Sequence, residues 1–268
     1  MRQCRFGINA DIYENRPEEE FLSCIKAAGF DEVFSLYPSP ERVRELAEHF
    51  ARHGLDFACI HAPWDGINHL WREGEAGEET IARLIACTES CGELGVPMTV
   101  IHLSSGEKAP PITDCGRRRL EKLVETAEKQ KVILAFENQR KLANLAYVFE
   151  EYANSPYVGF CWDCGHESCF TPGRAHMPLF GKKLVYTHIH DNFGLPDRQT
   201  PDAHLIPFDG NIDYRYVADM LDRVDFDGTL TLEVAGDSPR YADLTLEQFC
   251  ARAAEAVRRL AGLRTDRG

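Results

Sequence analysis

The 268-residue chain lacks any apolar run approaching the roughly 18 residues of a membrane span, so the sequence predicts no transmembrane helix. It also lacks a basic excess, because 30 Lys and Arg stand against 43 Asp and Glu, for a formal net charge of −13. An acidic chain repels a phosphate backbone, which argues against a nucleic-acid partner. No apolar signal segment precedes the first strand-like residues, and we therefore expect a cytoplasmic protein.

Several ligand-binding motifs are missing as well. No Gly-x-Gly-x-x-Gly follows the first predicted strand, and no Gly-x-x-x-x-Gly-Lys occurs, which disfavours dinucleotide-binding and P-loop folds. Of the ten cysteines, Cys161, Cys164 and Cys169 are clustered, but no second pair at zinc-knuckle spacing follows them. We expect reduced thiols and no structural zinc knot.

What the chain does contain is a regular alternation of strand and helix patterns. Short apolar, β-branched runs predict strands at 6–10, 32–37, 56–60, 98–101, 132–136, 184–187 and 228–232, and in a run from Val158 that closes with Asp163 and His166. Amphipathic periodicity predicts helices at 17–28, 39–54, 78–94, 113–130, 142–152, 213–223 and 244–263, with a short one between 174 and 181. Residues 65–77 and 193–212 are expected to be long loops. The pattern predicts an α/β protein, a single (β/α)₈ TIM barrel domain over residues 1–268, rather than a doubly wound open sheet.

Ionisable side chains stand where six consecutive predicted strands end. They are His61, His102, Glu137, Asp163, His188 and Glu233. Each alone has an ordinary interpretation as a hydrogen-bonded loop residue. In a barrel, however, all carboxyl ends of the strands lie on one rim, where active sites are built. Six such residues in succession therefore predict a metal site.

The same positions carry sequence motifs that resemble a known family. The motifs are His61-Ala-Pro, Ile101-His102, Phe136-Glu137-Asn138, Trp162-Asp163-Cys-Gly-His166, Thr187-His-Ile-His-Asp-Asn192, the block Asp202-Ala-His-Leu-Ile-Pro-Phe-Asp-Gly-Asn-Ile-Asp213, and Leu232-Glu233. In this order they resemble the xylose isomerase-like TIM barrel superfamily, which includes sugar isomerases, ketose 3-epimerases, inosose dehydratases and the endonuclease IV group.

In the epimerase-like members, the resemblance implies one divalent ion, Mn²⁺, Mg²⁺ or Co²⁺, held by Glu137, Asp163, His188 and Glu233. Three carboxylates and one imidazole suit such an ion. The implied enzyme isomerises or epimerises a small carbohydrate through a metal-stabilised enediolate, with Glu137 and Glu233 as the acid–base pair. His166 resembles the substrate-orienting histidine, and its alternative role is to hydrogen-bond Asp163.

The endonuclease IV group offers an alternative, a Zn²⁺-dependent phosphodiesterase with up to three ions. Its ligand pattern adds His61, His102, His166, Asp202 and His204 to the four residues above. The acidic balance argues against it, and the basic run 117–119 is expected to face solvent. A third hypothesis is a catalytically inactive sugar-binding barrel.

Three sequence features bear on details of the site. Phe208 replaces the first glycine of the family's Gly-x-Gly turn, so the family pattern does not determine the path of that loop. His190 lies two residues after His188; we expect His188 to be the ligand and His190 a neighbour on the rim that contacts substrate. Trp64 predicts either an apolar wall for a sugar or loop packing. The substrate class is a ketose, sugar phosphate or inosose, and a homodimer is expected by analogy alone.

Overall fold

The computed structural model describes residues 4–11, 18–194 and 201–264. Its strands are β1 (Phe6–Asn9), β2 (Glu32–Leu36), β3 (Asp56–His61), β4 (Met98–Ile101), β5 (Ile133–Glu137), β6 (Val158–Asp163), β7 (Leu184–His188) and β8 (Leu230–Leu232). Its α-helices are α1 (Glu18–Ala28), α2 (Pro40–Arg52), α3 (Glu75–Leu94), α4 (Asp114–Gln130), α5 (Leu142–Glu151), α6 (Cys164–Phe170), α7 (Met177–Phe180), α8 (Tyr214–Arg223) and α9 (Leu246–Leu263). Nearly every predicted element is present, with shifts of a few residues at the ends.

The chain forms two compact units. The first contains Met1–Phe34, His49–Phe57 and Trp162–Gly268, and the second contains Ser35–Glu48 and Ala58–Cys161. In the first unit β1 pairs in parallel with both β2 and β8, and Ile189 just after β7 forms a parallel bridge with Leu232. In the second unit β4 pairs in parallel with β3 and β5, and β5 with β6.

The strands follow the order β7-β6-β5-β4-β3-β2-β1-β8, so that each strand neighbours the one before it in sequence. Because β1 pairs with β8, and β8 also neighbours the end of β7, this order has no free end. Eight consecutive parallel strands alternating with helices make up the (β/α)₈ TIM barrel, and the predicted fold class is confirmed.

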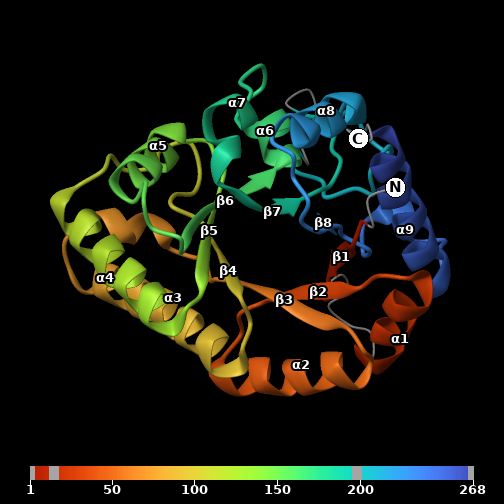
Figure 1. Ribbon diagram of the computed structural model, residues 1–268, viewed down its shortest axis with the longest axis horizontal. Helices are drawn as coiled ribbons and strands as arrows, with labels where there is room; N and C mark the ends of the chain where they lie inside the picture. The colour runs from red at the N-terminus through yellow and green to blue at the C-terminus, as the bar shows by residue number, and fades with distance from the viewer. Residues whose placement is uncertain (1–3, 12–17, 195–200, 265–268) are drawn as a thin grey trace. The chain divides into compact units, whose positions relative to one another are not determined.

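The helices pack in pairs within each unit. In the second unit α3 lies along α4, and in the first α1 lies along α9 (Figure 1). Local sequence explains where two of them begin: Thr113 accepts a hydrogen bond from Gly116 N at the start of α4, and Thr245 and Gln248 form a capping box at the start of α9.

Two expectations about the second unit are wrong. The stretch 65–77 is not a plain loop, because Ile67–Trp71 forms a 3₁₀ helix and α3 begins at Glu75. Ile67, Leu70 and Trp71 are buried, so their three- and four-residue spacing was a helical signal. Arg119 does not face solvent: it is buried and donates to the carbonyl oxygens of residues 69, 70 and 72, which lie at the end of that short helix.

The cysteines, the helix hydropathy and the end of β6 each bear on a sequence prediction. All ten cysteines are free thiols, as expected. No helix of the described residues combines the length and hydropathy required to cross a bilayer. The run from Val158 contains a boundary that the sequence did not reveal: the strand stops at Asp163, and α6 starts at the next residue.

Candidate metal-binding site

The ionisable residues predicted at the strand ends do lie at the carboxyl ends of the strands. His61, Glu137, Asp163 and His188 are the last residues of β3, β5, β6 and β7. His102 and Glu233 come directly after β4 and β8. Side chains at this position in a barrel point toward the catalytic face.

In the second unit these residues form a compact group around one carboxylate. His102 Nε2 lies 2.7 Å and His61 Nε2 3.3 Å from the same oxygen, Glu137 Oε2. Gln139 Nε2 is 3.3 Å from His102 Nε2, and His61 Nδ1 is 2.9 Å from the carbonyl oxygen of Ala62. One ligand atom from each of His61, His102 and Glu137 lies within 4.8 Å of the others. Two imidazoles and a buried carboxylate are a donor set that fits a divalent transition metal.

Trp64 lies beside this group. Its ring centroid is 4.9 Å from that of His61 and 5.7 Å from that of His102, and the side chain is 37% exposed. One part of the ring therefore contacts the histidines while another part faces solvent.

In the first unit His188 Nδ1 lies 3.2 Å from Glu233 Oε2. The ring of His188 is stacked on Phe34, with centroids 4.8 Å apart, which sets its plane. Glu233 is more open than the other carboxylates at the strand ends, with 15% of its side chain exposed. This pair repeats, at β7 and β8, the histidine–carboxylate arrangement of the second unit.

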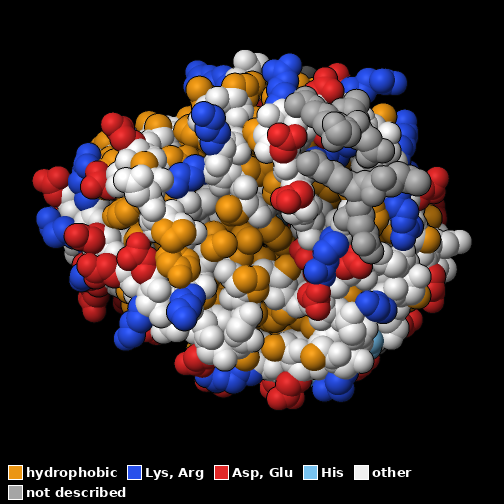
Figure 2. Space-filling model, in the orientation of Figure 1, with side chains coloured by type: hydrophobic (Ala, Val, Ile, Leu, Met, Phe, Trp, Pro, Cys, Tyr) orange, Lys and Arg blue, Asp and Glu red, His pale blue; other side chains and the backbone are white. Residues whose placement is uncertain are grey.

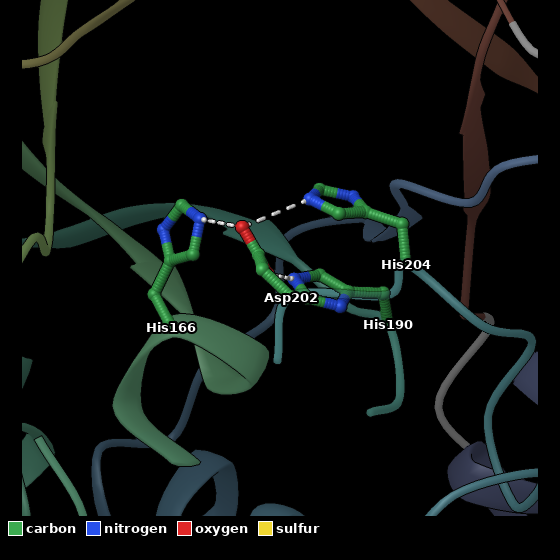
Figure 3. Close-up of side chains that lie close together, drawn as sticks. All are labelled: His166, His190, Asp202 and His204. Atoms are coloured by element: carbon green, nitrogen blue, oxygen red, sulfur yellow. Dashed lines mark ion pairs between the residues drawn. The ribbon is translucent and has the colours of Figure 1, made fainter. Parts of the chain in front are cut away.

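A second group of the first unit contains His166, His190, Asp202 and His204 (Figure 3). Asp202 Oδ2 lies 3.2 Å from His166 Nε2 and 3.5 Å from His204 Nε2, and Asp202 Oδ1 lies 3.7 Å from His190 Nε2. One ligand atom from each of the four lies within 4.8 Å of the others, so three imidazoles converge on one carboxylate. This donor set also fits a transition metal.

Asp163 connects this group to the end of β6. It is the N-cap of α6, where its Oδ1 accepts a hydrogen bond of 2.6 Å from His166 N. His190 Nε2 lies 3.1 Å from the same oxygen. The His166 imidazole is closer to Asp202 than to Asp163, at 3.2 against 3.5 Å.

The structure differs from the expectation for His190. It is not an open rim residue: its side chain is completely buried, between Asp163 and Asp202 and against the ring of His204. Gly165 makes the space for it, since a Cβ at that position would overlap the His190 ring. In the sequence, the glycine between Cys164 and His166 was the signal that another side chain packs closely at this position.

The charges within this group shift the pKa values of Asp202 and His204. Burial by itself raises the pKa of Asp202, but the His166 charge and hydrogen bonds from His166 and His204 outweigh it, and the pKa lies well below its usual range. Burial lowers the pKa of His204, but its hydrogen bond to Asp202 and the charges of Glu233, Asp202 and Asp163 raise it to about 9. Without a metal the group therefore contains a charged histidine beside a carboxylate at neutral pH.

The chain matches one protein-family model over most of its length. The family is described as xylose isomerase-like TIM barrel, and the match covers residues 22–263. An uncharacterized protein of Sinorhizobium fredii is 35% identical over 124 residues, which are 46% of this chain and 36% of that protein. An uncharacterized protein of Methanocaldococcus jannaschii is 23% identical over 251 residues, 85% of this chain and 83% of that protein.

Solved structures with the same fold include sugar epimerases. The IOLI protein with a binding zinc atom has a TM-score of 0.79 and 21% identity, covering 98% of this chain and 99% of that one. A D-tagatose 3-epimerase-like protein has a TM-score of 0.76 and 20% identity, with 97% of each chain covered. D-Psicose 3-epimerase with D-tagatose, from Clostridium cellulolyticum, has a TM-score of 0.75 and 14% identity, covering 97% and 100%. At these identities the likeness shows a shared fold.

Proposed function

The chain belongs to the xylose isomerase-like TIM barrel family, and we propose that it is a divalent-metal-dependent isomerase or epimerase of a small carbohydrate. The observation that carries the proposal is the pair of imidazole–carboxylate contacts at strand ends, His102 with Glu137 and His188 with Glu233. Structures of the same fold named as ketose epimerases support the substrate class.

We propose that Glu137, Asp163, His188 and Glu233 hold one Mn²⁺, Mg²⁺ or Co²⁺ ion. Each is at the carboxyl end of its own strand, and the register pairs Glu137 with Cys161, two residues before Asp163 on β6. Three carboxylates and one imidazole suit a hard or borderline cation. Such an ion, when bound, supplies Lewis acidity toward the oxygens of a ketose.

The protein side chains supply the proton transfers. Glu137 takes the proton from the carbon beside the carbonyl group, and Glu233 returns a proton on the opposite face. The partial exposure of Glu233 agrees with a group that meets substrate. His166, at the first turn of α6, orients the substrate, and the exposed part of the Trp64 ring packs on an apolar sugar face.

The partner in this proposal is a small molecule in the cytoplasm, not nucleic acid. Lys and Arg side chains stand singly among acidic and neutral ones over the described part of the face in Figure 2, and they form no continuous basic surface there. Together with the net charge of −13, this leaves little attraction for a phosphate backbone.

A Zn²⁺-dependent phosphodiesterase is the second candidate, and specific geometry favours it. His61 and His102 share one oxygen of Glu137, and three histidines surround Asp202, so donors exist for more than one ion. Two or three zinc ions per chain, with cleavage of an abasic-site duplex that disappears in His61→Ala and His204→Ala, would establish this activity instead.

The decisive experiment combines metal content with proton exchange. We expect about one Mn, Mg or Co per chain in protein purified without added metal. With a panel of ketoses and inososes in deuterated water, the wild type should incorporate deuterium beside the carbonyl, and Glu137→Gln and Glu233→Gln should lose at least 100-fold of that rate. Full exchange in both variants would contradict the two-carboxylate mechanism. Metal binding without exchange into any sugar would indicate a catalytically inactive sugar-binding barrel.

A further inference from the structure

Asp202 and His204 lie on an irregular segment, the 201–212 loop. Its backbone pairs with the end of β7 at one point, the antiparallel bridge between Asp191 and Leu205, with N···O distances of 2.7 and 2.8 Å. Two residues of the loop adopt left-handed backbone angles, with φ of 45° at His204 and 74° at Phe208. Such angles cost energy for residues with a Cβ atom, so other contacts must hold the loop.

Those contacts converge on the carboxylate of Asp191. Its Oδ2 accepts from Phe208 N at 2.9 Å, and its Oδ1 accepts from Ile212 N at 3.1 Å and from Asn192 N at 2.9 Å. Gly210 N also donates to the carboxylate. The side chain is completely buried. Hydrogen bonds from backbone N–H groups to a buried carboxylate are charge-assisted and are stronger than those between neutral groups.

The loop also fits closely around Asp191. A Cβ atom at Gly210 would overlap Asp191 Oδ1 and the carbonyl oxygen of Asn192. The loop backbone therefore approaches the carboxylate more closely than any residue other than glycine allows at that position.

We propose that Asp191 is the positioning residue of the 201–212 loop and thereby sets where Asp202 and His204 meet His166 and His190. Asp191 does not itself contact substrate or metal. It follows His190 directly in the chain, so the carboxylate that anchors the loop is attached to one of the histidines that the loop must reach. For its consequence at the site, this inference rests on the second candidate function, in which the group of His166, His190, Asp202 and His204 also binds a metal ion.

The test begins with the loop itself. In Asp191→Asn an NH₂ group replaces one acceptor oxygen and faces backbone donors. By hydrogen exchange, the amides of Phe208, Gly210 and Ile212 should then exchange at least 10-fold faster than in the wild type. Gly210→Ala should have the same effect with the carboxylate intact. Asp213→Asn is the matched control, because Asp213 caps α8 through Arg215 N and should leave the loop amides unchanged.

The consequence for the site is measured with Co²⁺ alone, by titration of the visible absorption bands. We expect Asp191→Asn to weaken Co²⁺ binding 10- to 100-fold, as loss of supporting hydrogen bonds does at metal sites. Asp202→Ala should cause a similar loss, and the double variant should lose little more, because both changes remove one ligand position.

Unchanged loop exchange in both Asp191→Asn and Gly210→Ala would overturn the proposal, and if Asp191→Asn fails to fold, Gly210→Ala alone decides. Faster loop exchange with unchanged Co²⁺ binding would overturn the link to the site. A wild-type protein that binds Co²⁺ but acts on no sugar would contradict the proposed function and leave the role of Asp191 standing.

Discussion

The rings of His190 and His204 lie stacked, with centroids 3.9 Å apart and planes 8° apart. This stack turns the Nε2 atom of each ring toward Asp202, at 3.7 and 3.5 Å. One histidine follows β7 and the other belongs to the 201–212 loop, so the stack joins two segments of the first unit at the site. Its geometry depends on the space that Gly165 leaves and on the path of the loop.

Replacing Gly165 by alanine should disrupt this stack. The new Cβ would overlap the His190 ring, and the stacked His204 ring leaves His190 little room to move. We expect a loss of about 1–3 kcal/mol of unfolding free energy, together with weaker metal binding. Gly262→Ala is the control, since nothing lies within 4 Å of its Cβ position in α9, and it should stabilise by about 0.5–1 kcal/mol. Urea unfolding measures both, and wild-type stability of Gly165→Ala would contradict the packing.

Phe208 should be strained in its backbone while its ring stabilises the loop. It replaces a glycine of the family pattern yet keeps a glycine-like φ of 74°, and its ring packs on Tyr214 and under Arg259. Both Phe208→Gly and Phe208→Ala remove the ring, and only alanine keeps the strain. The glycine variant should therefore be more stable than the alanine variant by about 1 kcal/mol in urea unfolding. Equal stabilities would mean that φ is negative in solution.

Arg119 should be a major contributor to the stability of the second unit. Its guanidinium donates hydrogen bonds to the carbonyl oxygens of Leu70 and Arg72 at 2.8 and 2.7 Å. The guanidinium also lies 3.0 Å from a carboxylate oxygen of Glu78. Arg119→Met leaves buried carbonyls without their donor and should lower the unfolding free energy by about 2–4 kcal/mol. Arg118→Met, at an exposed neighbouring position, should change it by less than about 0.5 kcal/mol. Similar effects of the two substitutions in thermal or urea unfolding would contradict the buried role.

His176 should make the protein sensitive to mild acid. It is fully buried, with Nε2 2.9 Å from Thr171 Oγ1, and burial lowers its pKa from 6.5 to about 4. The unfolded chain takes up this proton below pH 6.5 and the folded chain near pH 4, so the stability contribution is complete above pH 6.5 and is lost as pH falls toward 4. The loss amounts to about 3 kcal/mol at most. NMR titration of the ring protons checks it, and a midpoint near 6.5 would refute it.

Removing bound metal should destabilise the protein. An ion that binds the folded chain alone adds about 2.7 kcal/mol at a hundredfold excess over its Kd, so chelation should lower Tm and added Mn²⁺ or Co²⁺ should restore it. The shift should disappear in His188→Asn and persist in His53→Asn, which changes a histidine that pairs with Glu19 at the surface. Equal metal-induced shifts in both variants, followed by thermal unfolding, would exclude His188 as a ligand.

The sequence by itself determined the fold class and the positions of the candidate ligands. A short apolar run such as 133–137 favours a buried strand over a helix because of its length, and helices between successive strands favour parallel pairing. In such a barrel a residue at a strand end, such as His61 or Glu137, belongs to one face whatever the details of packing.

Tertiary structure decided how the individual side chains are used. His188 and His190 look alike in sequence and both are buried, but His188 lies against Phe34 and Glu233, whereas His190 lies against Asp163 and His204. In sequence Arg119 resembles its exposed neighbour Arg118, but in the fold Arg119 donates hydrogen bonds to carbonyl oxygens near residue 70. These outcomes depend on contacts between residues far apart in the chain, and no local pattern of charge or hydropathy records such contacts.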